Sequence, residues 1–432
     1  MEDHIDLSAF KPATREEWIQ KIEAELKGKS ADQLSWSSFD GTSQVISTKE
    51  DLGESRFSGP IGASKGMSNK WDIEMDFSSK TKPFYDALEG DGIDALNLDA
   101  EMFSARELSH LPNGSSLKIF LDNLEDPAIL NSSELPPNLT GVNWKHTASK
   151  VSLLGDLFAA RQLNKGVYSL ACANGLKWSN KGAYISQELA FALAEGHDLL
   201  VELMKNGKSV DEVSNCIQFK MGIGNSFFKE IAKFRALRTL WSSIVSAYKP
   251  SDDKSLQTKI RAYNSQWNKT AIDEQTNLLR TTTEAMSAIM GGVDTLCVMP
   301  CNALTEQTAG AYRWSRNIQL LLRDESFLNR VIDPGSGSYF IEEWSKKISD
   351  KAWEIFQEIE KRGGYYFCLE SGVLDEMCSN SASEQVEQVE SGERIVIGAN
   401  AFRSKHSDKP TNSVEGRLAS SVELNVVSTE KR

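Results

Sequence analysis

The fold is decided by a stretch that begins NLLRTTTEAMSAIMGGVDTLCVMP, residues 277–300, and runs on to Gly364. Apolar side chains from Leu278 to Ile289 recur at near-helical spacing, which predicts a helix over 277–290. Gly291-Gly292 then suits a left-handed helix end. Residues 293–299 are typical of a buried strand, which Pro300 ends. The stretch therefore predicts a helix, a buried strand and further helices in succession.

Upstream of this stretch, short apolar runs alternate with helical patterns, as in a parallel sheet built from βα units. The eight candidate strands are Trp71–Met75, Ile93–Leu98, Leu117–Leu121, Leu139–Asn143, Val167–Cys172, Ile217–Met221, Ile260–Tyr263 and Val293–Met299. This pattern suits an eight-stranded α/β barrel of the TIM type, and it also suits an open doubly wound sheet.

Two long helices are predicted at 186–205 and 227–248. In the second, basic residues are interleaved with the apolar ones, and we interpret them as a solvated helix face. These basic residues are Lys229, Lys233, Arg235 and Arg238. Earlier, Thr14 and Glu17 form a capping-box pattern that predicts an opening helix within residues 10–34.

Composition narrows the functional classes. The chain has 432 residues and a net charge of −13, so a nucleic-acid or anionic-membrane surface is disfavoured. Six scattered cysteines form no metal-binding or disulfide pattern, the acidic N-terminus resembles no targeting signal, and no apolar run reaches membrane-spanning length. We therefore expect a cytoplasmic protein without a metal site.

Several longer motifs carry a specific resemblance. They are NLLRTTTEAMSAIMGGVDTLCVMP, RWSRNIQLLLRDESFLNRVIDPGSGSYFIEEW, KAWEIFQEIEKRGG, KGAYISQELAFALAEG, FFKEIAKFRALRTLW and NSQWNKT. Together they resemble the acyl-CoA mutases, above all the methylmalonyl-CoA mutase family, and the details fit its small, auxiliary (beta) subunit. The resemblance favours the TIM-type (β/α)8 barrel over the open sheet.

The resemblance also implies an organisation. We expect an N-terminal arm and linker for subunit docking in residues 1–70, the mutase-like barrel in 71–400 and a polar tail in 401–432. The opening helix would dock on a large catalytic subunit through Trp18, Ile22 and Leu26. Residues 395–397 offer a short strand before the tail, and the amphipathic patch 418–427 is expected to be able to fold back onto the barrel.

In this family, adenosylcobalamin is held through a histidine in an Asp-x-His-x-x-Gly motif. None of the five histidines has Asp two positions before it. The resemblance therefore implies that the partner subunit binds the cofactor and that this chain has no cobalamin-binding domain. The holoenzyme would interconvert (R)-methylmalonyl-CoA and succinyl-CoA in propionate metabolism.

The resemblance further implies a dismantled catalytic site. Catalytic subunits carry a Tyr-His pair before Glu-Ala-Gly-Ala, and the matching positions here are Leu176 and Lys177. Leucine cannot form hydrogen bonds and lysine cannot act as a neutral imidazole, so we expect no catalytic residues. Leu176 and Trp178 are expected to help fill the barrel axis. Candidates for contacts near the family's cofactor cavity are Arg280, Thr281 and Glu284.

Other motifs have structural interpretations. Cys297 and Cys301 lack a neighbouring base and are interpreted as buried structural thiols, and residues 335–338 as a tight turn. Two alternatives remain open: a barrel subunit of a split mutase acting on another branched acyl-CoA, and a stand-alone barrel that binds acyl-CoA or a protein partner without turnover.

Overall fold

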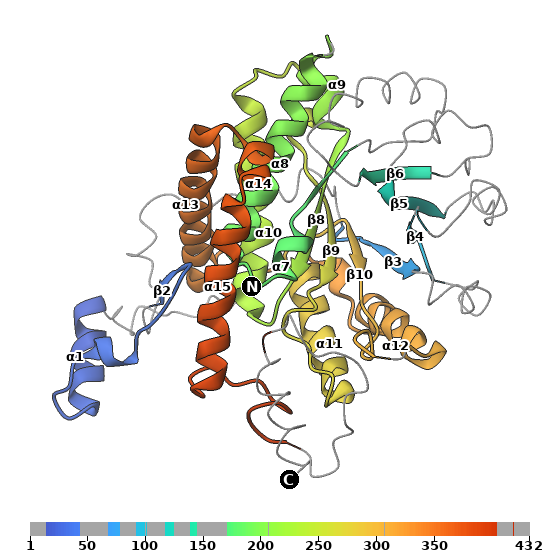
Figure 1. The fold of residues 1–432 in the computed structure, drawn as a ribbon. Coiled ribbons are helices and arrows are strands. Elements are labelled where there is room, and N and C mark those ends of the chain that lie inside the picture. The colour runs from blue at the N-terminus through green and yellow to red at the C-terminus, as the bar shows by residue number, and fades with distance from the viewer. Residues whose placement is uncertain are drawn as a thin grey trace, which may run out of the picture.

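The computed structural model describes residues 14–43, 68–77, 92–99, 101, 117–124, 139–144, 171–205, 207–305, 307–403 and 418. Its centre is a sheet of eight parallel strands in the order β6-β5-β4-β3-β10-β9-β8-β7 (Figure 1). These strands are β3 (Asp72–Phe77), β4 (Ala95–Asp99), β5 (Lys118–Leu124), β6 (Leu139–Trp144), β7 (Ala171–Asn174), β8 (Ile217–Ile223), β9 (Lys259–Asn264) and β10 (Thr295–Cys297).

The sheet curls into a nearly closed barrel because its first and last strands in sequence are neighbours. Thr295 on β10 lies beside Asp72 on β3 and also beside Arg261 on β9. Among the described residues, the edge strands β6 and β7 are not hydrogen-bonded to each other, so the described sheet is not closed between them. The predicted (β/α)8 barrel is confirmed, and every predicted strand coincides with an observed one to within a few residues.

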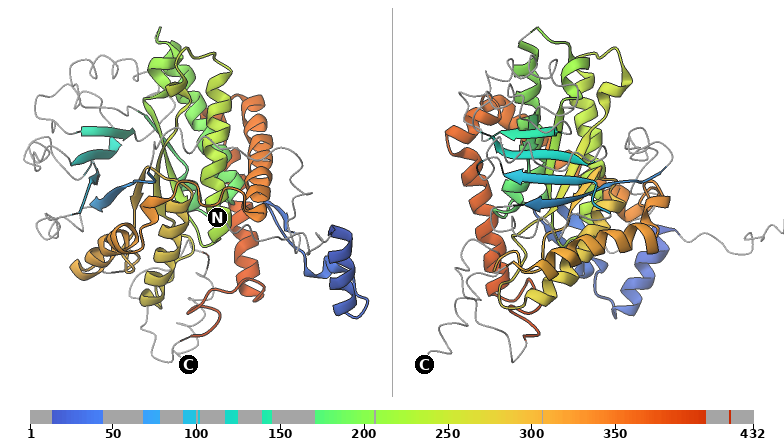
Figure 2. Two further views of the ribbon diagram at one scale, coloured as in Figure 1. Left: turned by 180° about the vertical axis from the view of Figure 1, so that it is seen from behind. Right: turned by 90° about the vertical axis from the view of Figure 1, so that its right-hand side faces the viewer.

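The described helices cover the outer face of this barrel on the side of β7, β8, β9 and β10 (Figures 1 and 2). The α-helices after the fifth strand are α7 (Leu176–Ser179), α8 (Ile185–Lys205), α9 (Val210–Ser214), α10 (Phe227–Ser246), α11 (Glu274–Met290), α12 (Ala309–Leu320), α13 (Tyr339–Arg362), α14 (Tyr365–Glu370) and α15 (Val373–Glu390). Short 3-10 or π turns are η5 (Asp253–Leu256), η6 (Leu321–Glu325) and η7 (Leu328–Arg330). The predicted helices at 186–205, 227–248 and 277–290 are confirmed within two to three residues at each end.

The basic residues of α10 contradict the predicted solvated face. Lys229, Lys233, Arg235 and Arg238 are 7%, 0%, 0% and 1% exposed. Arg235 pairs with Asp333 and Glu342 at 3.0 and 2.8 Å, and Arg238 pairs with Asp294 at 2.9 Å. The prediction was wrong because α10 is packed between α8, α11 and α13, so each cation meets a buried acceptor from a different element.

The N-terminal segment projects from this body (Figures 1 and 2). It consists of α1 (Arg15–Glu25), η1 (Ala31–Leu34) and a hairpin of β1 (Trp36–Ser38) and β2 (Gly41–Ser43). The predicted capping box is confirmed, since Thr14 Oγ1 accepts from the Glu17 amide and Glu17 Oε2 accepts from the Thr14 amide. No residue of α1 is buried, whereas the hairpin touches the barrel: Trp36 stacks on Trp344 with ring centroids 5.7 Å apart.

The segment that follows the last barrel helix differs from the sequence-based prediction. Helix α15 continues to Glu390, and the predicted strand at 395–397 is wrong: it is reduced to one bridge between Ile397 and Ala401, because the chain turns sharply between these residues. Leu418 is 1% exposed and donates its amide to the Trp267 carbonyl, while residues 419–427 of the predicted amphipathic patch lie outside the described residues. Among the helices that are described, none combines the length and apolar character needed to span a bilayer.

Candidate functional site

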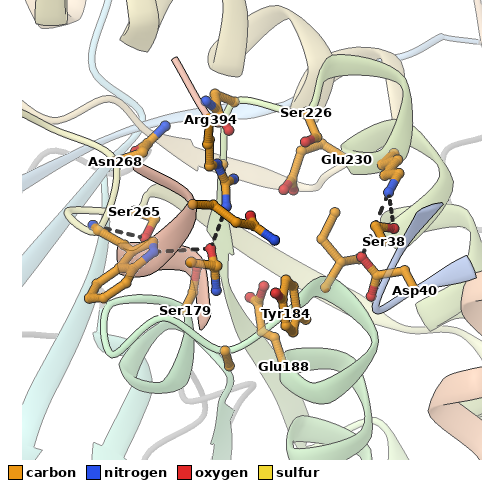
Figure 3. Close-up of a pocket in the computed structure, with 18 of the residues that line it drawn as sticks. Ser38, Asp40, Ser179, Tyr184, Glu188, Ser226, Glu230, Ser265, Asn268 and Arg394 are labelled. Atoms are coloured by element: carbon orange, nitrogen blue, oxygen red, sulfur yellow. Dashed lines mark hydrogen bonds and ion pairs between the residues drawn. The ribbon is translucent and has the colours of Figure 1, made fainter. Parts of the chain in front are cut away.

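A cavity of about 320 Å³ lies where the carboxyl ends of β7, β8 and β9 meet two distant segments of the chain (Figure 3). From the barrel, Ser179, Gly224 and Ser265 line it. Over the barrel mouth, it is enclosed by the β1–β2 hairpin and by the end of α15 with the turn that follows. This is the end of a barrel at which enzymes of this fold place their functional groups.

Beneath this cavity, two buried carboxylates share one ammonium group. Lys233 Nζ lies 3.0 Å from Glu188 Oε2 and 2.6 Å from Glu230 Oε2, and all three side chains are at most 3% exposed. The amide of Gly222 donates to Glu188 at 2.6 Å. A Cβ at residue 222 would lie 2.3 Å from Ser179 Oγ, so glycine permits this close approach.

The two carboxyl groups of this triad have higher pKa values than carboxyl groups on an exposed surface. Burial raises the pKa of Glu188 to about 7, and Glu230 adds to this rise while Lys233 opposes it. Burial also raises the pKa of Glu230, again against the attraction of Lys233. Two adjacent buried carboxylates with one cation disfavour double ionisation. The triad therefore disfavours the simultaneous ionisation of Glu188 and Glu230 near neutral pH.

The barrel axis contains a second charged group, which we call the axis cluster: Glu74, Asp76, Asn97, Asp122, Lys220, Arg261 and Tyr263. Arg261 on β9 binds Glu74 on β3 with two hydrogen bonds of 3.0 and 2.8 Å, and it donates to Asn97 on β4 at 2.9 Å. Lys220 on β8 pairs with Asp122 on β5. Because these strands are not neighbours in the sheet, the contacts pass through the inside of the barrel.

Burial and ion pairing shift the pKa values of the carboxyl groups in the axis cluster in opposite directions. Burial raises the pKa of Glu74 and of Asp76. For Asp122, burial is opposed by Lys220 and Arg261, which together hold its pKa below the ordinary value. The cluster is also packed tightly, since Arg261 lies 3.8 Å above the Phe120 ring and Lys220 lies 4.2 Å above the Tyr263 ring. The axis is thus occupied by closely packed charged side chains joined by the Arg261–Glu74 and Lys220–Asp122 pairs.

A further cavity of about 390 Å³ lies at the amino ends of the strands. Phe120, Gln218 and Arg261 are part of its wall, together with residues such as Lys118 and Lys259. None of Glu74, Asp122, Lys220 and Arg261 lines the cavity at the opposite end. The axis cluster therefore lies between the two cavities.

The degenerate site positions lie beside the carboxyl-end cavity. Leu176 and Lys177 begin α7, and Lys177 Nζ lies 5.2 and 5.1 Å from the ring centroids of Trp178 and Tyr365. Trp178 is buried among helices, where its indole nitrogen donates to Tyr365 and its ring meets Phe191 edge-on. Trp178 therefore does not fill the axis, which the charged cluster occupies, and the expectation for Leu176 stays a prediction.

The three predicted cofactor-contact candidates have internal partners. Glu284 is buried and accepts hydrogen bonds from Asn264 at 2.7 Å, Asn268 at 2.8 Å and Lys269 at 2.8 Å. Thr281 donates to the carbonyl of Leu278 within its own helix. Arg280 donates to Asn277 and to the Ile397 carbonyl. Glu284 is thus buried next to Asn268, which lines the cavity. Arg280 is bonded to the C-terminal turn through the Ile397 carbonyl.

Other predicted features are structural. All six cysteines are free and buried, and burial raises the pKa of Cys297 well above its ordinary value. Residues 335–338 form the predicted turn, in which the amide of Ser338 donates to the Gly335 carbonyl. Of the five histidines only His197 is described, and it lies on α8 between Tyr248 and Glu360 at 2.7 and 2.9 Å.

The fold and site define a class: an α/β barrel with a cavity at its carboxyl mouth and charged side chains across its axis. A family model described as methylmalonyl-CoA mutase matches residues 147–426. The chain belongs to the methylmalonyl-CoA mutase family.

Three relatives show how this similarity is distributed. The methylmalonyl-CoA mutase small subunit of Porphyromonas gingivalis is 32% identical over 91% of this chain and 70% of its own length. The large subunit of Propionibacterium freudenreichii subsp. shermanii is 34% identical over 59% of this chain. The Escherichia coli methylmalonyl-CoA mutase is 31% identical over 60% of this chain. The matches span only 35% and 36% of the last two proteins.

The mutases of this family depend on adenosylcobalamin, which supplies organic radical chemistry when bound. The residues described here do not fit that group. His197, the histidine that the structure places, has its two ring nitrogens beside Tyr248 and Glu360 and lines neither cavity. The barrel axis is crossed by the Arg261–Glu74 and Lys220–Asp122 pairs.

Proposed function

We propose that this chain is the small, non-catalytic subunit of a heterodimeric methylmalonyl-CoA mutase. The large subunit would bind adenosylcobalamin and carry out the conversion of methylmalonyl-CoA to succinyl-CoA. The similarity to a small subunit over most of both chains supports this assignment. Leu176 and Lys177, which cannot replace a Tyr-His pair chemically, also support it.

The observation that carries the proposal is the axis cluster. A catalytic barrel of this family needs room along its axis for the acyl-CoA arm, but here the buried Arg261–Glu74 pair crosses that space with two hydrogen bonds. Admitting a ligand would require breaking the pair, and separating a buried ion pair costs about 3–5 kcal/mol. Binding of an apolar acyl chain would have to repay this cost before any net affinity appeared.

The N-terminal segment supports a docking role. Trp18 is 49% exposed, no residue of α1 is buried, and the helix projects from the barrel. The face formed by Trp18, Ile22 and Leu26 would bind the large subunit. In this proposal, residues 1–70 are the docking arm, 71–400 the barrel and 401–432 a tail. Six free, buried thiols suit a reducing compartment such as the cytoplasm.

The proposal is tested by reconstitution. The purified chain, the large subunit of the same mutase and their co-purified complex are assayed for methylmalonyl-CoA isomerisation, and each is examined for the visible absorbance of bound cobalamin. We expect both properties in the complex and neither in this chain alone. Turnover by this chain without a second polypeptide would contradict the proposal.

A second candidate is favoured by the cavity at the amino ends of the strands, which measures about 390 Å³ and has Lys118, Lys259 and Arg261 in its wall. Cationic side chains at such a position would suit the phosphates of an acyl-CoA. The chain would then bind acyl-CoA without turnover. Lys118 is, however, already paired with Asp72 at 2.6 Å and Arg261 with Glu74, so the first proposal is preferred.

A further inference from the structure

Arg394 is the least compensated cation in the wall of the carboxyl-end cavity. It follows α15 and is half-buried, and its Nη1 donates to the amide oxygen of Gln385 at 2.8 Å. Within the described ranges no carboxylate lies at ion-pair distance from its guanidinium group. Burial lowers the pKa of Arg394, which means that its charge is poorly solvated where it lies. Figure 3 shows its side chain directed into the cavity.

A second cation, Lys229, lines the same cavity from α10. Its Nζ donates to Ser38 at 2.7 Å, lies 3.9 Å from Asp40 and stacks 3.9 Å above the Trp344 ring. Burial lowers the pKa of Lys229 to about 8; Asp40 opposes this, and repulsion from Arg394 and Lys347 adds to it. Two cations that repel each other across a cavity favour an anion between them.

The acidic residues of the cavity are already engaged. Asp40 accepts from the amide and hydroxyl of Ser186 at 3.0 and 2.7 Å, and Glu188 and Glu230 share Lys233. The cations that line the cavity are Lys229 and Arg394, since Lys233 lies behind the wall between its two carboxylates. Asp40 lies 3.9 Å from Lys229, so Arg394 is the lining cation that has no carboxylate at ion-pair distance within the described ranges; Glu393, also in the wall, is exposed to solvent.

We propose that this cavity binds a small organic monocarboxylate, with its carboxylate paired to Arg394. The planar fork of a guanidinium group matches a carboxylate with two parallel hydrogen bonds. A single negative charge matches the one unpaired cation of the wall, Arg394, whereas the second charge of a phosphate would meet no further unpaired cation among the described lining residues. The serines and Asn268 of the wall provide hydrogen bonds to the body of the ligand, and Trp36 and Trp267 provide apolar surface.

A ligand in this cavity would contact both the N-terminal hairpin and the segment after α15. Ser38 and Trp36 belong to the β1–β2 hairpin, and Arg394 to the segment after α15, so an occupant would bridge two parts of the chain that lie more than 350 residues apart in sequence. Both segments would become harder to displace from the barrel mouth. This site is separate from the axis cluster, and the inference stands independently of the role as a subunit.

The test uses the full chain without a partner or CoA. Acetate, propionate and lactate are titrated while heat and tryptophan fluorescence are recorded, with chloride as an ionic-strength control and inorganic phosphate as a competing anion. We expect saturable binding of at least one monocarboxylate, with quenching that depends on Trp36 or Trp267. We expect phosphate to bind less tightly than that monocarboxylate.

Variants decide whether Arg394 is responsible. Arg394→Gln should weaken binding by about ten-fold or more, because it removes a charge-assisted pair, whereas Arg362→Gln, the same change at an exposed position of α13 that does not line the cavity, should bind as the wild type does. Arg394→Lys keeps the positive charge but lacks the planar guanidinium group, so its affinity should lie between those of the wild type and Arg394→Gln. If Arg394→Gln fails to fold, Arg394→Lys is tested in its place. Equal affinity of wild type and the Arg394 variants, tighter binding of phosphate, or no saturable binding by the wild type would overturn the proposal.

Discussion

At the scale of single residues, this barrel is unusual for the charge that it buries. Arg261 and Glu74 are 2% and 0% exposed, in a position where barrels commonly place branched apolar side chains. The cost of removing both charges from water is offset only while each keeps its partner. The axis cluster is therefore sensitive to the loss of any one member.

Glu74→Gln tests this sensitivity. The substitution keeps the size of the side chain but leaves the Arg261 charge without its carboxylate, and we expect the free energy of unfolding to fall by about 3–5 kcal/mol. Urea denaturation measures the change. Asp350→Asn is the matched control, because Asp350 pairs with Lys346 on an exposed surface and should have little effect. A wild-type stability in Glu74→Gln would mean that the cluster is not a constraint on the axis.

Glu188 predicts a pH dependence of stability. Its pKa is raised in the folded state from 4.5 to about 7, so the folded protein holds this proton more tightly than the unfolded chain does. The stability that this group contributes is complete below pH 4.5 and is lost as the pH rises through about 7.

Glu188→Gln, which carries no titrating group, should remove this slope. The unfolding free energies of wild type and Glu188→Gln are measured from pH 5 to pH 8. We expect the wild type to lose stability relative to Glu188→Gln as the pH rises. Glu387→Gln, at an exposed position of α15, is the control and should run parallel to the wild type. Parallel curves for Glu188→Gln as well would contradict the raised pKa.

At the scale of elements, the strands and long helices could be predicted from sequence because their signals are local. Apolar runs, glycine pairs and the Thr14–Glu17 capping box need no knowledge of tertiary contacts. The axis cluster was missed although its signal is also present. In β3 (DIEMDF), polar Asp72, Glu74 and Asp76 alternate with apolar residues, and β8 (IQFKMGI) repeats this with Gln218, Lys220 and Gly222.

That alternation has a definite meaning in a barrel. Helices cover the outer face, so the apolar set of each strand points outward and the polar set points to the axis. The cations of α10 were misjudged for a related reason. At about 100° per residue, Lys229 points about 120° away from Arg235 and about 180° away from Arg238, so these cations cannot share one solvated face. Which partner each one meets depends on long-range packing, which a single sequence does not display.

The exposed helix α1 is the element that we expect to bind the large subunit. Replacing Trp18 and Ile22 with Asp should weaken association with the large subunit by several kcal/mol, since aromatic anchors dominate interfaces and buried unpaired charge is costly. Because α1 contributes no buried residue, the unfolding temperature of the isolated chain should hardly change. Binding to an immobilised large subunit measures the effect.

Gln20→Asp provides the matched control for this helix. It adds one negative charge, as each Asp of the double variant does, at a position about 200° from Trp18 around α1, on the opposite face. We expect its association with the large subunit to equal that of the wild type. Unchanged association of the Trp18 and Ile22 double variant would show that the partner binds elsewhere.

At the scale of the whole molecule, the barrel keeps the architecture of its family while its axis is closed by charge. The carboxyl-end cavity lies above the axis cluster and the amino-end cavity below it. An acyl-CoA arm running along the axis would have to displace the Arg261–Glu74 and Lys220–Asp122 pairs. The account therefore predicts a scaffold that cannot hold the substrate in the manner of a catalytic barrel.

Calorimetric titration of the isolated chain with CoA and succinyl-CoA tests this claim most directly. The account predicts no saturable heat with either compound, while the complex with the large subunit binds succinyl-CoA under the same conditions. A one-to-one isotherm of micromolar affinity for the isolated chain would contradict it, because the axis would then be open to the ligand.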